Sequence, residues 1–110
     1  MWTPDITAGL RALVQEVPED RRCVAEGYVS ELSFMAQTLD TLKNSIRENG
    51  PIELFVNGRQ QMYRESPALK GYNTTVQRYA TIYKQLVALL PEDKRPEEDS
   101  ELERFITQGV

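Results

Sequence analysis

The stretch FVNGRQQMYRESPALKGYN, residues Phe55–Asn73, carries two different structural signals. Asn57-Gly58 is typical of a tight β-hairpin turn, because a type I′ turn needs positive φ at both central residues. Ser66-Pro67 is typical of a helix start, because the hydroxyl caps free N–H groups and the proline ring holds φ near its helical value. The stretch therefore predicts a β-hairpin that is followed at once by a helix.

Two long helices are predicted on either side of this hairpin. The first spans roughly residues 18–49, because Pro18 suits a first helical turn and Asn49-Gly50 supplies a left-handed C-cap. The second runs from Pro67 to Leu90, where Pro91 ends it. In both segments apolar residues recur at alternating steps of three and four, which indicates an apolar seam. The seams are Ala25, Tyr28, Leu32, Met35, Leu39, Leu42 and Ile46 in the first helix and Leu69, Tyr72, Val76, Tyr79, Tyr83, Leu86 and Leu90 in the second.

Helices with matching seams pack side by side as in a coiled coil, so we expect these two to form an antiparallel pair. A shorter N-terminal helix, roughly Pro4–Val17, can lay Ile6, Leu10, Leu13 and Val17 against them. The predicted fold class is mainly α: a long antiparallel helical hairpin with a short β-hairpin inserted between the two long helices, plus a short N-terminal helix. No internal repeat is expected.

The predicted β-hairpin needs a partner. With Asn57-Gly58 as the turn, Leu54 faces Gln61 and Ile52 faces Tyr63, and both faces of the ribbon carry apolar residues. An isolated two-stranded ribbon is marginal in water, and this one has two open edges. Packing on its own helices buries one face, whereas neighbouring copies bury both. The pattern favours a homo-oligomer with an interface at Phe34 (an off-seam aromatic), Ile52, Leu54, Phe55, Val56, Met62 and Tyr63.

Charge is distributed unevenly along the 110 residues. The net charge is -4, from 13 Lys/Arg and 17 Asp/Glu, yet residues 51–90 carry five basic and two acidic side chains. A basic middle is compatible with binding to a polyanion such as DNA, whereas the alternative is that each cation only solubilises its surface. The candidate DNA-binding residues are Arg59, Arg64, Lys70, Arg78 and Lys84.

The sequence offers little for catalysis. It has no histidine and a single cysteine, Cys23, so the common nucleophile–base pairs and a cysteine zinc site are excluded. It has no phosphate-binding glycine motif. We expect no enzymatic activity, no cofactor and no metal. No apolar run approaches the roughly 20 residues of a membrane span, and the N-terminus lacks the pattern of a secretory signal, so a cytoplasmic protein is expected.

The order of these elements resembles a family of tailed-phage terminase small subunits. The resemblance is carried by a helix, ENGP, an extended segment with Asn-Gly, and then ESPALKGYNTTVQRYATIYKQLVALLP, over about Glu19–Pro91. Members of that family form rings, bind double-stranded phage DNA when packaging starts, and recruit and regulate the large ATPase–nuclease subunit. The resemblance implies a non-catalytic small subunit that acts in the bacterial host cytoplasm. The alternative is a helical-hairpin assembly or regulatory adaptor without a nucleic-acid role.

The last twenty residues differ from the rest. Residues 1–91 are predicted to be one helical domain for oligomerisation and DNA binding, and residues 92–110 an acidic linker with a C-terminal docking segment. Pro91–Ser100 is too charged to pack and is expected to be a mobile linker. Beyond it, Ser100 and Glu103 match a capping box, and one helical face carries Leu102, Phe105 and Ile106. This face can dock on the chain's own ring or, as the resemblance implies, on the large subunit.

Overall fold

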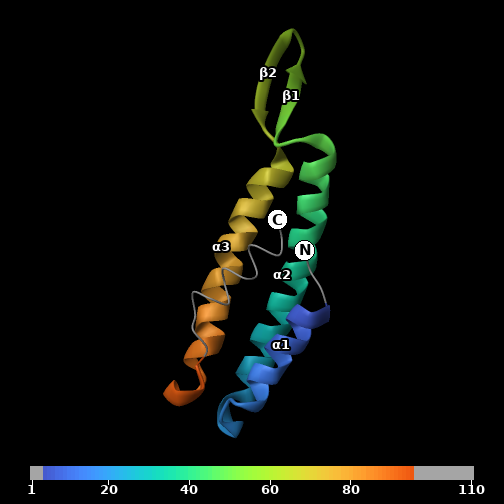
Figure 1. Cartoon of the computed structure of the whole chain (residues 1–110). Coiled ribbons are helices and arrows are strands. Elements are labelled where there is room, and N and C mark those ends of the chain that lie inside the picture. The colour runs from blue at the N-terminus through green and yellow to red at the C-terminus, as the bar shows by residue number, and fades with distance from the viewer. Residues whose placement is uncertain (1–3, 96–110) are drawn as a thin grey trace.

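The computed structural model describes residues 4–95 of the chain. The elements are α1 (Pro4–Gln15), a 3-10 turn η1 (Glu19–Arg21), α2 (Arg22–Asn49), β1 (Ile52–Asn57), β2 (Gln60–Glu65), α3 (Pro67–Ala88) and a 3-10 turn η2 (Glu92–Lys94). Helices α2 and α3 run antiparallel, α1 lies against the first half of α2, and the hairpin extends from the far end (Figure 1). The predicted fold class is confirmed.

The core lies along the predicted seams of α2 and α3. Leu32 and Leu86 are fully buried, and the seam residues nearer the hairpin, such as Leu42 and Leu69, are only partly buried. Four buried apolar residues were not among those predicted to pack: Val14, Val29, Ala36 and Val87. The buried stripe of α2 is wider than a two-helix seam because α1 covers a second side of it.

Local signals set the ends of the long helices. The Ser66 hydroxyl accepts from the backbone N–H groups of Ala68 and Leu69 at 3.1 and 3.3 Å, which confirms the predicted N-cap of α3. Gly50 has a φ of +82° and donates its N–H to the Ile46 carbonyl at 2.7 Å, so it ends α2 as predicted. The start of α2 differs, because Pro18 opens a 3-10 turn and the α-helix begins only at Arg22.

A short repeat forms the end of the molecule opposite the hairpin, which corrects the expectation that the chain has no internal repeat. VPEDRR (residues 17–22) follows α1, and LPEDKR (residues 90–95) follows α3. In both copies a buried apolar residue precedes proline, and the proline carbonyl accepts at 2.9 Å from the N–H three residues later. In both copies the final arginine turns back onto the preceding helix. Its Nε donates to the buried residue's carbonyl, at 3.0 Å in the first copy and 3.2 Å in the second.

The hairpin has a different register from the predicted one. Gly58 and Arg59 form the two-residue loop, and Asn57 pairs with Gln60 at the end of the strands. Gly58 has a φ of +63°, and no non-glycine residue in the described chain has positive φ. A turn with positive φ only at its first central residue fits type II′, not the expected type I′. Leu54 therefore faces Tyr63 instead of Gln61, although the residues on each face of the ribbon remain as predicted.

Candidate assembly and nucleic-acid interfaces

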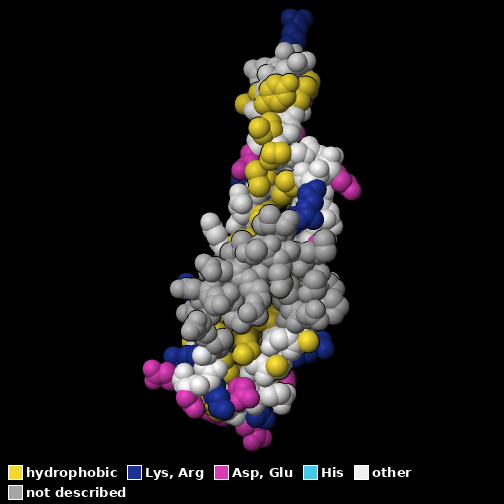
Figure 2. Space-filling view, viewed as in Figure 1, with side chains coloured by type: hydrophobic (Ala, Val, Ile, Leu, Met, Phe, Trp, Pro, Cys, Tyr) yellow, Lys and Arg dark blue, Asp and Glu magenta, His cyan; other side chains and the backbone are white. Residues whose placement is uncertain are grey.

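The hairpin projects beyond the helical pair and exposes apolar side chains (Figures 1 and 2). One face carries Ile52, Leu54 and Val56 from β1 together with Tyr63 from β2, and we call it the Leu54–Tyr63 face. Tyr63 is 76% exposed and Leu54, its direct cross-strand partner, is 50% exposed. Apolar side chains that are paired with one another yet half open to water form a surface suited to a partner. The structure thus places most of the predicted interface residues on one free surface.

On the opposite face of the hairpin, an ion pair partly covers the apolar side chains. Arg64 donates to the Glu53 carboxylate at 2.7 Å, and its guanidinium lies 4.2 Å above the centre of the Phe55 ring. Phe55 is therefore only partly exposed, while Met62 across from it is 57% exposed. Because a carboxylate already binds Arg64, this cation is a weaker candidate for DNA than the sequence suggested.

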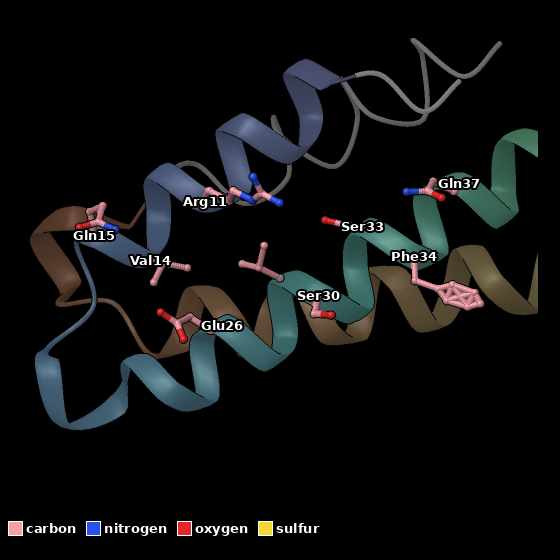
Figure 3. A pocket seen from close by; sticks show the side chains of 9 residues that line it. Arg11, Val14, Gln15, Glu26, Ser30, Ser33, Phe34 and Gln37 are labelled. Carbon is pink, nitrogen blue, oxygen red and sulfur yellow. The ribbon is translucent and has the colours of Figure 1, made fainter.

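Phe34 is exposed, as its off-seam position predicted, but the structure separates it from the hairpin. It lies about 22 Å before the end of α2, given a rise of 1.5 Å per residue over fifteen residues. Figure 3 shows it at one end of a groove of about 650 Å³ between α1 and α2, which Arg11, Glu26 and Ser33 also line. The Ser33 hydroxyl oxygen is buried there without a hydrogen-bond partner. Phe34 and the hairpin are thus two separate surfaces.

The candidate DNA-binding cations fall into two groups. Arg59, in the exposed turn, and Arg64 belong to the hairpin, while the other three lie on the solvent side of α3. We call this side the α3 outer face; its residues are Lys70, Thr74, Gln77, Arg78, Thr81, Lys84 and Gln85, all exposed. Helix α3 has no Asp or Glu between its first and last residue. The α3 outer face therefore carries only positive charge.

The tyrosines of α3 have the structural role that their seam spacing predicted. Tyr79 and Tyr83 are buried in the core, and Tyr72 is partly buried with the Lys43 ammonium 5.3 Å from its ring centre. Burial, with a smaller contribution from Tyr83, raises the pKa of Tyr79 well above its ordinary value of about 10. These rings are turned away from solvent, so the α3 outer face has no aromatic ring on which a base could stack.

The start of the acidic segment forms a turn. Glu92–Lys94 is η2, and Arg95 donates to the Leu90 carbonyl, while residues 96–100 of the predicted linker lie outside the described residues. The predicted docking residues Leu102, Phe105 and Ile106 lie outside the described residues. Within residues 4–95, no three His, Cys, Asp or Glu side chains converge as a metal site would require. No helix in that range is long and apolar enough to cross a membrane.

Comparisons with protein-family models, with curated proteins and with solved structures find no match to this chain.

Proposed function

We propose that this chain is the non-catalytic small subunit of a phage DNA-packaging terminase. In this function it assembles as a homo-oligomeric ring in the bacterial host cytoplasm, binds double-stranded phage DNA, and recruits and regulates the large ATPase–nuclease subunit. The proposal combines the family resemblance of the sequence with the two exposed surfaces of the molecule, the apolar hairpin and the α3 outer face.

The exposed Leu54–Tyr63 face carries the assembly part of the proposal. Its four apolar side chains are each at least half exposed, and they stand on a two-stranded ribbon with two open edges. Such a ribbon gains stability when another chain covers its apolar face or pairs with its edge. A ring supplies that cover at every subunit, because each protomer meets a neighbour through the same pair of surfaces.

The uneven charge of the chain supports the DNA-binding part. Residues 51–90 carry a net charge of +3, whereas the whole chain carries -4. Three phosphate contacts per protomer give weak binding alone, but a ring presents the same cations many times to one duplex. Modest charge on each subunit then becomes useful affinity.

The assembly is tested by measuring molecular mass with light scattering coupled to size exclusion. We expect the wild-type protein to have a mass several times the 12.6 kDa of one chain. Leu54→Glu places a charge at the centre of the Leu54–Tyr63 face and should give a monomer that keeps its helical circular dichroism. Val24→Glu is the matched control, because Val24 is 51% exposed but lies on α2 at the opposite end of the molecule.

DNA binding is tested on the same samples with a duplex fragment from a phage packaging site. We expect weak binding that falls steeply as salt is raised, because phosphate contacts release counterions. A wild-type protein that stays monomeric at micromolar concentration contradicts the ring. An oligomer that binds no duplex at low salt contradicts the terminase proposal and favours the assembly-adaptor alternative.

A further inference from the structure

Positive charge on the α3 outer face is not offset by any neighbouring acid of the same helix. Lys70, Arg78 and Lys84 are exposed, and none of them forms an ion pair with another described residue. Arg64 differs in this respect, because its guanidinium is bound by Glu53. Among the candidate DNA-binding cations, the three on α3 and Arg59 in the exposed hairpin turn are therefore open to an external anion, and the three on α3 share one side of a helix.

The three cations are spread along one side of the helix. Lys70 and Lys84 are fourteen residues apart, which corresponds to about 21 Å at 1.5 Å per residue. At about 100° per residue, all three lie within roughly 120° of the helix circumference. The buried rings of Tyr79 and Tyr83 occupy the other side. Cations spread over this length of one helix side match an extended polyanion better than a single small anion.

The middle of the α3 outer face is hollowed and supplies hydrogen-bond donors. A shallow hollow of about 510 Å³ is lined by Thr74, Gln77, Arg78, Thr81, Ile82 and Gln85. Thr74 and Thr81 already donate their hydroxyl hydrogens to the carbonyls of Lys70 and Gln77, at 3.1 and 3.0 Å. The donors left for a ligand are therefore the Arg78 guanidinium and the two glutamine amides. Phosphate oxygens only accept hydrogen bonds, so this donor set suits phosphate.

The composition of the face also distinguishes DNA from a protein partner. Protein interfaces depend on aromatic and large apolar anchors, whereas the only large apolar residue that lines the hollow is the partly buried Ile82. Cations and amides without such anchors are typical of contacts to the backbone of nucleic acid. The same composition lacks the aromatic platforms that single strands use. Duplex DNA is thus the occupant that the face fits.

We infer that the α3 outer face binds the phosphate backbone of duplex DNA and that Arg64 of the hairpin takes no part in this contact. The inference rests on the proposed function for the identity of the ligand, and it divides the molecule into a hairpin for assembly and a helix for DNA. Because the contacts are to phosphates, binding by this face is independent of base sequence.

The test compares neutral substitutions at matched positions. Lys70→Gln, Arg78→Gln and Lys84→Gln, alone and combined, are measured beside Arg64→Gln, which removes the same charge from the hairpin. Binding of a mixed-sequence 30-base-pair duplex is measured over a range of salt concentrations, and light scattering checks the mass of each variant. Each single α3 variant should reduce the magnitude of the slope of log K against log salt by about 0.9 for every protomer that contacts the duplex. The triple variant should bind the duplex at least about tenfold more weakly at low salt. Arg64→Gln should change neither quantity.

The outcomes separate this inference from the proposed function. A triple α3 variant that keeps wild-type mass, affinity and slope overturns the inference, and so does a flattened slope in an Arg64→Gln variant of wild-type mass; in both cases DNA binding itself stands. A wild-type oligomer that does not bind the duplex at low salt overturns both. Loss of binding in the triple variant with unchanged mass and an unaffected Arg64→Gln supports the inference, because misassembly is then excluded.

Discussion

Arg22 and Arg95 close the C-terminal ends of two different helices in the same way. Each donates from Nε to the carbonyl five residues earlier, and from Nη2 to the carbonyl seven residues earlier, at 3.3 and 3.4 Å. The last carbonyls of a helix lack partners within it and carry partial negative charge. Each arginine satisfies the carbonyl of the last helical residue, Gln15 or Ala88, and a second carbonyl in the turn two residues later, so its charge also complements the helix dipole. Arg22 is also the first residue of α2, so its two hydrogen bonds hold the turn between α1 and α2 in place. We call such a pair of arginine hydrogen bonds a clip.

Loss of the first clip should destabilise the fold more than loss of the second. We expect Arg22→Ala to lower the free energy of unfolding by about 1 kcal/mol, which is the usual contribution of such a hydrogen bond, and Arg95→Ala to lower it less. The reason is that Arg22 is partly buried and joins two helices, whereas Arg95 is exposed and holds only the segment after α3. Urea denaturation of the variants measures both effects. If Arg95→Ala lowers the free energy of unfolding as much as Arg22→Ala does, or more, the prediction is wrong.

The turn of the hairpin should depend on Gly58 and tolerate change at Asn57. Gly58 has positive φ in a type II′ turn, so Gly58→Ala forces an alanine into a sparsely populated backbone region, which costs on the order of 1–3 kcal/mol. Asn57 is an ordinary strand residue here, so Asn57→Ala should cost little. Hydrogen exchange of the amides in β1 and β2 measures hairpin opening separately from the helices. A type I′ turn requires positive φ at both positions and would make the two substitutions similarly costly.

Truncation should give different results at two sites that are four residues apart. A chain ending at Pro91 loses the hydrogen bonds of Arg95 and the Lys94–Glu16 ion pair of 3.8 Å. The end of the molecule opposite the hairpin should therefore unfold at a lower temperature. A chain ending at Arg95 keeps both. Under the proposed function it should retain oligomer mass and DNA binding, while losing affinity for the terminase large subunit. The measurements are thermal unfolding, light scattering and pull-down with the large subunit. If the chain ending at Arg95 dissociates, the last fifteen residues belong to the ring and the docking hypothesis fails.

Stability should fall in alkaline solution because Tyr79 is held neutral. Its pKa is raised in the folded state, so the contribution of the neutral phenol is fully present below the unfolded pKa of about 10. Above that pH the unfolded chain loses this proton and the folded chain keeps it, so stability declines by up to about 1.4 kcal/mol per pH unit. Tyr79→Phe should have a shallower decline between pH 9 and 11 in urea denaturation. An unchanged slope would assign the alkaline effect to other groups.

The sequence by itself determined the helix ends nearest the hairpin and the presence of the hairpin. These features depend on signals that act within one turn of chain, such as the Ser66 cap or the left-handed Gly50, and no distant contact competes with them. The faces of α3 followed in the same way from the helical period. That is why the exposure of Lys70, Arg78 and Lys84 and the burial of Tyr79 could be predicted.

Packing between elements was decided only by the tertiary structure. Val29 is buried beside α1, with which it lines one groove, and nothing in the spacing of α2 alone states where α1 lies. Phe34 is likewise on the surface as predicted, yet its separation from the hairpin depends on the lengths and directions of whole elements. The VPEDRR and LPEDKR repeat is visible in the sequence. The hydrogen bonds from its final arginines back to the preceding segment exist only once the turns have folded.

The register of the hairpin depends on both local sequence signals and tertiary structure. The signal Asn57-Gly58 predicted the turn to within one residue, but two turn types compete there and strand pairing chooses between them. The observed type II′ turn needs positive φ only at glycine, and its register sets Glu53 opposite Arg64, whereas the expected register set Glu53 opposite Met62. A shift of one residue in the turn thus determined which of the hairpin's cations is bound internally. That contact depends on cross-strand geometry, which no local pattern in the sequence fixes.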